Sequence, residues 1–446
     1  TYNSFDRVTG RLGVLEPSLV YGSNAVTLIL TAGSLVTNVT GASPTARAFA
    51  RGLDRLRRRS YNNLYNLYGN IDVMDAAQLT ATLNNLAPTI VNEAQAVSVG
   101  QYDMMVDIVS DRLSMLGTSS QQSGTFSVVG APEMLGVAAS NANVSRATAT
   151  QLSFAGRLVS NGRTLGTLPE NVSGFISGGY EARSSATRFG SRSDNQASWH
   201  IAMGLEVEVA DNLTVGGASA FINGRTTLQG SQAQLLTNQA MVYASYQLGG
   251  GAYVAGLGSA SVSNIETARY ASGSLETARF GNETRALNYM AGVETGIAIG
   301  IADGFQLTPR AAVRYSHSEF GGYDEVGSEI ALSIDDIREQ RLEGRLGFAF
   351  SGDTTIGGGW SLRPQISADY VRAIGQSERD MTVRFAQAGG VPILLPGLAA
   401  DNQWTEMRGG LSLERGNLSL TTAFETDIGR SELRDDRAVA ELSLRF

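Results

Sequence analysis

The sequence has 446 residues and a formal net charge of −8, and 17% of its residues are charged, against about 25% in a typical soluble domain. It contains no cysteine, which excludes disulfide bonds, thiolate nucleophiles and cysteine-ligated zinc, and its acidic balance argues against nucleic-acid binding. No apolar run reaches the roughly 18–20 residues of a membrane-spanning helix, so a bilayer is crossed, if at all, by a β-barrel.

Short β-rich segments occupy the first forty or so residues. They lie at 11–15, 18–21 and 25–30, separated by Gly, Pro and Asn, and look like the last rungs of a stacked β structure. We assign residues 1–42 to this structure. Because so short a piece is not stable alone, and because no signal peptide is seen, we expect further chain to precede it.

A helical pattern replaces the β pattern from Ser43 onwards. Ser43 is placed to cap a helix that has Pro44 in its first turn. A stripe of apolar residues follows at helical spacing, namely Ala46, Phe49, Ala50, Leu53 and Leu56. Asp72 is expected to cap a second helix that stops before Pro88, and a third helix is expected over 97–116.

The remainder of this helical region offers little chemistry. Its arginine cluster is interpreted as a solvated helix face rather than an anion site, because no aromatic residue interleaves with Arg55, Arg57, Arg58 and Arg59. Residues 117–168 are rich in Ser, Gly, Asn, Ala and Thr, and contain one candidate helix near 146–160. We therefore treat residues 43–168 as a helical linker.

From residue 171 to the end, the apolar residues alternate with a period of two. Twelve such segments are expected, at 172–182, 197–209, 213–227, 235–248, 252–266, 284–298, 304–319, 336–351, 359–384, 401–415, 417–428 and 436–446. Short Gly- and Asn-containing turns alternate with longer polar loops between them. Short turns on one rim and long loops on the other are typical of an outer-membrane barrel.

The lengths and faces of these segments favour a membrane barrel over a soluble sandwich. Residues 341–350 alternate between apolar and charged side chains, and segments of this length cross a bilayer when tilted, whereas sandwich strands are usually about 5–6 residues long. An even number of strands allows antiparallel closure. Aromatic residues lie toward the segment ends, as an interfacial girdle requires: Trp199, Tyr253, Tyr289, Tyr315, Trp360, Tyr370 and Trp404.

The opposite face of the segments is expected to line a hydrated lumen. Its acidic members are Glu206, Glu208, Glu294, Glu343, Asp369, Glu406, Glu414, Glu425 and Glu441. Its basic members are Arg310, Arg314, Arg341, Arg345, Arg363, Arg408 and Arg445. The two signs are interspersed, and a twelve-stranded lumen is wide enough to hold one α-helix of about 10–12 Å diameter.

Three stretches resemble the classical (type Va) autotransporters of Gram-negative bacteria. Residues 5–28 look like the end of an autotransporter passenger β-helix, and residues 45–116 look like the helical region that follows it. The terminal Leu442, Leu444 and Phe446 resemble the aromatic signal read by the barrel-assembly machinery, although Glu441 stands where that signal often has Gly. The resemblance implies a passenger end at 1–42, a linker at 43–168 and a translocator barrel at 169–446.

This resemblance implies a translocator and anchor in the outer membrane that exports its own N-terminal passenger and displays it on the cell surface (type V secretion). The implied partners are outer-membrane lipid and lipopolysaccharide, the barrel-assembly machinery, periplasmic chaperones and the passenger; no nucleic acid and no cofactor is expected. A helix is expected in the pore. It is either 97–116, whose Asp103, Asp107, Asp111 and Arg112 would meet lumenal charges, or 146–160.

Catalytic chemistry is not expected in this chain. Its two histidines, His200 and His317, are placed near strand ends, so a triad or a two-histidine metal site is not expected. Pore self-cleavage is disfavoured because the linker has no paired asparagines, and any enzymatic activity is assigned to the passenger. Two alternatives remain: a 12-stranded diffusion porin with an open lumen, or a barrel-embedded hydrolase with catalytic residues clustered at a rim.

Overall fold

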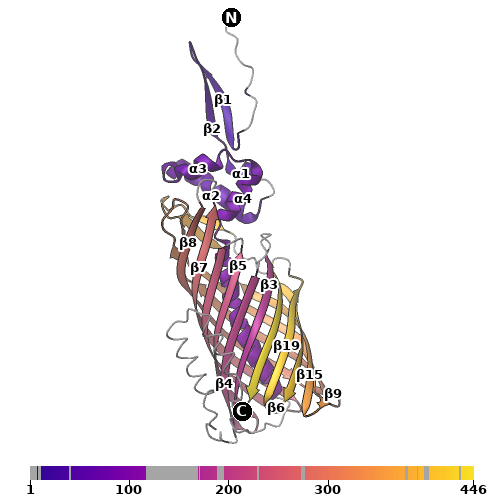
Figure 1. The fold of residues 1–446 in the computed structure, drawn as a ribbon. Helices are drawn as coiled ribbons and strands as arrows, with labels where there is room; N and C mark the ends of the chain where they lie inside the picture. The colour runs from indigo at the N-terminus through magenta and orange to yellow at the C-terminus, as the bar shows by residue number, and fades with distance from the viewer. Residues whose placement is uncertain are drawn as a thin grey trace.

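The structure combines a long barrel with a helical body at one rim (Figure 1). It is a computed structural model that describes residues 8, 12–39, 42–116, 169, 171–187, 195–228, 231–272, 277–376, 380–388, 390–395, 401–430 and 433–445. Within these residues, every helix is too short or too polar to traverse a bilayer. The linker after residue 116, the candidate helix at 146–160 and Phe446 lie outside the described residues.

Twelve long antiparallel strands form the closed barrel that the sequence predicts. They are β3 (Val172–Thr187), β4 (Asn195–Ala210), β5 (Leu213–Leu228), β6 (Ser231–Gly249), β7 (Ala252–Ser272), β8 (Thr277–Ile297), β10 (Phe305–Phe320), β13 (Ile337–Gly352), β15 (Trp360–Gln376), β18 (Gln403–Arg415), β19 (Leu418–Ile428) and β20 (Leu433–Arg445). Each pairs with the next, and β20 pairs with β3. The short β9 (Ile299–Ala302) and β14 (Thr354–Gly357) only extend this wall.

The connections divide into a rim of short turns and a rim of long loops. Short turns need backbone conformations that glycine adopts readily, and Gly304 and Gly416 have φ values of 75° and 57°. One predicted segment was too long. The segment at 359–384 was expected to be a single strand, but β15 ends at Gln376 and β16 (Met381–Phe385) belongs to another sheet, because alternation resumes after the chain has left the wall.

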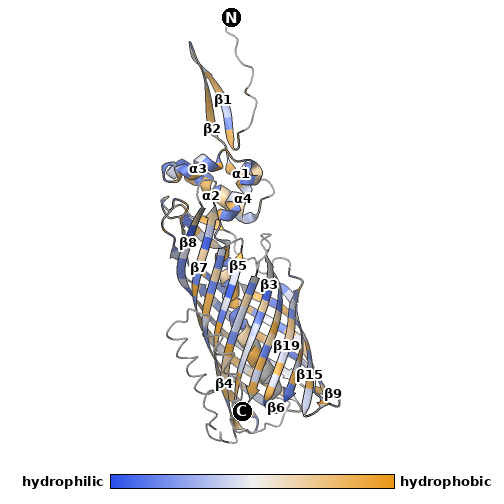
Figure 2. Cartoon of the chain, in the orientation of Figure 1, coloured by the Kyte–Doolittle hydropathy of each residue, from blue (hydrophilic) through white to orange (hydrophobic). Residues whose placement is uncertain are grey.

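Apolar and polar residues alternate along the strands (Figure 2), and their burial separates an exposed apolar face from an inner polar face. On β13, Leu346 is 66% exposed and Phe348 is 46% exposed, whereas Glu343 is 4% exposed. Exposed Leu, Ile, Val and Tyr side chains recur on the outward face of the other strands, including Tyr289, Tyr315 and Tyr370. A barrel whose apolar side chains point outward is suited to hydrocarbon rather than water.

The helices precede the barrel in the chain. They are α1 (Leu35–Asn38), α2 (Pro44–Ser60), the 3-10 helix η1 (Tyr61–Leu64), α3 (Tyr65–Ile71), α4 (Ala76–Leu86) and α5 (Thr89–Leu116). Ser43 caps α2 as predicted, accepting a hydrogen bond of 3.0 Å from the Ala46 amide. The third helix begins at Thr89, immediately after Pro88, rather than at residue 97. The first two turns of this helix are less amphipathic because they are already buried between the preceding helices and the barrel.

Two expectations for the helical region were wrong. The cap of α4 is Asp75, which forms a capping box with Gln78, and not Asp72. Asp72 instead accepts two hydrogen bonds from Arg57, at 2.7 and 2.5 Å, and this guanidinium also lies 4.6 Å from the ring centre of Tyr68. Arg57 is therefore part of a packed ion pair, while Arg58 and Arg59 are exposed.

Before the helices, β1 (Leu15–Tyr21) and β2 (Val26–Ala32) form an antiparallel hairpin that projects from the molecule (Figure 1). The structure thus shows a hairpin at this place, and its assignment to the end of a β-helix stays a prediction.

A second sheet, which the sequence did not predict, lies at the rim of long loops. Its strands are β11 (Tyr323–Asp324), β12 (Leu332–Ile334), β16 and β17 (Ile393–Leu395), from the two longest loops. We call it the loop sheet, and we call α1–α4 with η1 the helical cap. One continuous apolar core joins the helical cap, the loop sheet and the adjacent ends of β5–β8. Burial there raises the pKa of Tyr323 to about 12.

The outward face generates a direct test. Leu346→Arg places a charge midway along β13, and we expect it to destabilise the barrel by about 2–4 kcal/mol, the cost of arginine in hydrocarbon. The control Val326→Arg puts the same side chain in a long loop, where Val326 is already 82% exposed, and should change little. Urea titration of the folded band on unboiled gels measures both. Equal midpoints for the two variants would contradict a lipid-facing surface.

Candidate functional site

The lumen of the barrel holds α5 (Figure 1). Near the rim of long loops, Gln196 donates a hydrogen bond of 2.9 Å to Glu93. One turn further along, Ser98 lies 3.2 Å from Ser263 and accepts a hydrogen bond of 3.0 Å from Asn288. These partners come from β4, β7 and β8, so the helix lies against one side of the lumen, which we call the helix wall (β4–β8).

Uncharged polar groups continue this contact along the helix. Thr237 donates a hydrogen bond of 2.6 Å to the side chain of Gln101, and Gln239 donates one of 3.2 Å to the carbonyl of Tyr102. Glycines allow the close approach. A side chain on Gly224 would collide with the amide of Gln101, and one on Gly100 would collide with the guanidinium of Arg183.

Further along α5, the contact becomes apolar. Met105, Val106 and Val109 are fully buried. They pack in a cluster with side chains from the helix wall, namely Ala202, Ala218, Ala220, Ile222, Met241, Tyr243, Tyr253, Ala255 and Met290, and with Phe175 of the neighbouring β3. A helix that is buried on most sides loses the one-sided apolar stripe of a surface helix, which explains why α5 is only weakly amphipathic.

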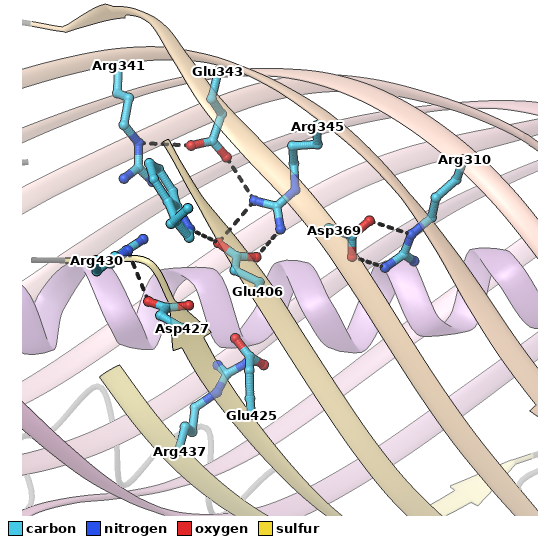
Figure 3. Close-up of polar contacts among 11 residues, drawn as sticks. Arg310, Arg341, Glu343, Arg345, Asp369, Glu406, Glu425, Asp427, Arg430 and Arg437 are labelled. Atoms are coloured by element: carbon cyan, nitrogen blue, oxygen red, sulfur yellow. Dashed lines mark hydrogen bonds and ion pairs between the residues drawn. The ribbon is translucent and has the colours of Figure 1, made fainter. Parts of the chain in front are cut away.

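The facing side of the lumen carries a network of ion pairs, shown in Figure 3, which we call the charged wall (β10, β13, β15 and β18–β20). Arg345 pairs with Glu343 at 3.0 Å and also with Glu406, and Arg341 pairs with Glu343 at 3.0 Å. The indole of Trp404 donates a hydrogen bond of 2.8 Å to Glu406.

More ion pairs extend the charged wall in both directions. Asp369 accepts hydrogen bonds from Arg310 at 3.0 and 2.5 Å, and Arg437 pairs with Glu425. Arg430 pairs with Asp427 at 3.1 Å, and its guanidinium lies 4.1 Å from the ring of Trp404. Because these charges are partly or fully buried, each needs a close partner of opposite sign, and the charged wall supplies such partners from its own strands.

A cavity of about 50 Å³ remains between α5 and the charged wall. It is lined by Ser110, Glu294, Arg310, Ala312, Arg314, Arg345, Ser367, Asp369, Glu406, Arg408 and Glu425. A cavity of this size holds a few water molecules.

Most lumenal candidates from the sequence lie in these contacts. Glu206 accepts a hydrogen bond of 2.9 Å from Tyr243, and Glu294 accepts one of 2.7 Å from Tyr253. Arg363 pairs with Asp353 and Glu414, near the rim of short turns. The cavity brings together Arg314, Arg408 and Glu425. Glu208, Glu441, Leu442 and Leu444 are partly buried near the strand ends.

The structure tests the pore-helix candidates unevenly. Residues 97–116 lie in α5, and Asp103 is partly buried where its charge acts on Arg341. The side chains of Asp107, Asp111 and Arg112 lie outside the described set. The rival segment at 146–160 does as well.

Three placements from the sequence were wrong. Tyr253 and Trp404 were assigned to the interfacial girdle, but both are 4% exposed and hydrogen-bond to lumenal carboxylates. His200 was placed at the rim, yet it is 1% exposed on the inner face of β4. His317 lies on β10 and stacks on Tyr289, with ring centres 4.8 Å apart. Position along a strand does not distinguish inner from outer aromatic residues, but parity within the strand does.

The sequence analysis did not single out the residues that join α5 to the helix wall. They are Gln101 of the helix and Thr237, Ser263 and Asn288 of the wall. A signal was present, because Thr237 and Gln239, like Ser259, Ser261 and Ser263, share the inward parity of their strands. Among the described residues, no cluster of His, Asp or Glu has a metal-binding arrangement. The contacts described above are made with a polypeptide helix, α5.

Comparison with known proteins agrees with this geometry. Residues 174–425 match the sequence model of the autotransporter beta-domain family. Solved structures that resemble the chain include the translocator domain of autotransporter NalP from Neisseria meningitidis, with 15% identity, a TM-score of 0.48 and coverage of 67% of this chain and 98% of that one. The beta domain of the Bordetella autotransporter BrkA has 16% identity, a TM-score of 0.45 and coverage of 61% and 99%. The search of curated proteins returned no match.

The charged wall generates a prediction of stability. Arg345→Leu leaves the buried Glu343 and Glu406 without their shared partner, and we expect a loss of about 3–5 kcal/mol in barrel stability. Arg338→Leu is the matched control, because Arg338 pairs with Glu319 on the exposed face. It should leave the urea midpoint in detergent unchanged. A loss for Arg345→Leu no larger than that for Arg338→Leu would show that the network does not stabilise the barrel.

Proposed function

The chain belongs to the autotransporter family, whose barrel is the outer-membrane translocator for its own surface-exposed passenger, and from this premise we propose that α5 is the segment that stays in the pore after export. Residues 97–116 form the greater part of this segment. The lumenal residues of both walls would then serve to hold it, and would not conduct solutes or perform catalysis.

The direction of the chain through the barrel is the observation that carries this proposal. The helix begins beside Gln196, next to a long loop, and reaches the cavity at Ser110. The first barrel strand then starts at Val172, which pairs with Val207 near a short turn. The chain therefore crosses the lumen once between the two rims. The described residues before α5 therefore lie on the side of the long loops, which is the cell surface in an outer-membrane barrel.

The two walls suit different steps of export. The helix wall offers hydroxyl and amide groups and small side chains that fit α5 closely. The charged wall is neutralised by its own ion pairs, so it does not present a strong net charge to a passing polypeptide. This division supports a lumen that admits chains of varied sequence and retains one particular helix.

The remaining assignments complete the proposal. Residues 1–42 would end the passenger, 43–168 would form the linker and 169–446 the translocator. Leu442, Leu444 and Phe446 would be read by the barrel-assembly machinery, with periplasmic chaperones escorting the unfolded chain. Lipopolysaccharide would surround the outer part of the barrel. Any enzymatic activity would belong to the passenger.

The alternatives from the sequence receive less support. A diffusion porin needs an open lumen. In the described part of this barrel, α5 lies in the lumen, and a cavity of about 50 Å³ lies beside it. A barrel-embedded hydrolase needs converging catalytic groups, whereas His200 faces inward and His317 stacks on the exposed Tyr289.

A disulfide provides the test on the complete protein, because the native sequence has no cysteine. Ser98→Cys with Ser263→Cys joins α5 to β7, where the two hydroxyls lie 3.2 Å apart. We expect a mild oxidant to link this pair in nearly all mature molecules on intact cells, seen as altered migration without reductant. Ser98→Cys with Ser412→Cys is the control, because Ser412 lies on β18 close to its short turn. Failure of the first pair to link, or equal linking of both, would exclude α5 as the resident pore segment.

A further inference from the structure

The helical cap is attached to the loop sheet by a tightly packed interface. Phe49 of α2 contacts Phe385 of β16 edge to face, with ring centres 6.1 Å apart. Gly52 faces Ile393 of β17 so closely that a side chain on the glycine would lie 2.5 Å from it. Asn63 donates a hydrogen bond of 2.6 Å to the carbonyl of Gln387. The long loop between β15 and β18 thus forms a surface that fits the linker helices.

One buried arginine joins the cap, the loop sheet and the barrel. Arg269, on the extension of β7 beyond the barrel, is 1% exposed and stacks on Phe280 at 4.7 Å. It pairs with Glu325, also buried, and donates a hydrogen bond of 3.2 Å to the carbonyl of Ile330. It donates another of 3.0 Å to the carbonyl of Leu86, the last residue of α4. We call this group the Arg269 junction.

The chemistry at the end of α4 explains why an arginine is needed. The last carbonyls of a helix lack intrahelical partners and carry partial negative charge. Pro88 follows two residues later and has no amide hydrogen to offer. Arg269 satisfies the Leu86 carbonyl, while Glu325 neutralises the guanidinium and also accepts a hydrogen bond of 2.9 Å from the amide of Leu332.

Most of this junction is contributed by the barrel and its loops. Arg269, Phe280, Glu325 and Ile330 all follow the linker in sequence, whereas only Leu86 comes from the exported side of α5. The barrel and its loops therefore supply the binding partner for the end of α4, and in the docked structure the Arg269–Glu325 ion pair is buried. Buried pairs of this kind give specificity of fit more than net stability.

Size makes the docked cap a mechanical barrier. The lumen holds a single helix, α5, which packs against the helix wall. The helical cap packs α2 against α4 around Leu53, Leu83 and Tyr68, all fully buried. Two packed helices, each about 10 Å across, do not fit where one helix already fills the space.

We propose that the helical cap is an extracellular stopper, held by the Arg269 junction, which prevents α5 from slipping back through the barrel after export. The proposal rests on the proposed function of α5 as the resident pore segment. It adds a second role for the linker: α2–α4 fold on the loop sheet outside the cell, and their folded width retains the helix that seals the pore.

The first test compares two arginine variants of the full chain on intact cells. Arg269→Met removes the junction, and we expect trypsin to cleave after the exposed Arg58 or Arg59 at least tenfold faster than in the native protein. Arg279→Met is the matched control, because Arg279 is exposed on the neighbouring strand and its guanidinium lies 5.7 Å from the ring centre of Tyr270. Heat-modifiable migration checks that both barrels are folded. Equal cleavage rates for the two variants would overturn the role of the junction.

The second test asks whether the cap retains α5. Gly52→Cys with Ile393→Cys, added to Arg269→Met, provides a disulfide that locks the cap on the loop sheet. The triple variant is measured in planar bilayers. With its two thiols reduced, its pore should open at least tenfold more often than that of the native chain. Oxidation of the thiols to the disulfide should abolish the excess openings. Openings no more frequent than native, in a variant whose cap is protease-sensitive, would overturn the stopper. The link between positions 98 and 263 separately reports whether α5 occupies the pore.

Discussion

In hydrocarbon, every backbone N–H and C=O group must find its partner within the protein, because no water is available to bond them. Pairing of β20 with β3 meets this requirement by joining the first and last strands of the wall. Closure then fixes the other properties of the barrel. Alternate side chains face lipid or lumen, so Leu346 is exposed while Glu343 is buried, and the polar groups turned inward must be satisfied by one another or by a segment inside.

The lumen meets this second requirement in two ways. On the helix wall, Thr237 and Ser263 bond to each other, and Thr237, Ser263 and Asn288 each bond to α5. On the charged wall, Arg345 and Glu406 pair across strands without help from the helix. The helical cap continues the same principle outside the membrane, where the carbonyl of Leu86 is satisfied by Arg269 of the barrel. One connected set of contacts therefore seals the lumen with α5, anchors the helical cap and completes the fold of the barrel.

The barrel was largely predictable because its pattern is local. The period of two along residues 341–350 identifies both the strand and its two faces. Turns that contain glycine mark strand ends, as Gly304 does before β10. The contacts that position α5 were not predictable in this way. Arg269 and Leu86 are 183 positions apart, and the loop sheet pairs β12 with β16 although two barrel strands, β13 and β15, lie between them in the sequence. Such pairings depend on tertiary structure, and Trp404 shows that even a correct strand leaves its aromatic residue on either face.

The central claim is that the apolar parity of the strands faces hydrocarbon. Single cysteines at positions 342–348 of the otherwise cysteine-free chain allow spin labelling in lipid bilayers. Oxygen, which concentrates in the bilayer, should relax the labels at Leu342, Leu346 and Phe348 strongly and those at Glu343, Arg345 and Gly347 weakly. Low oxygen accessibility at the even positions, with no alternation along β13, would show that these side chains are packed inside a dry protein core.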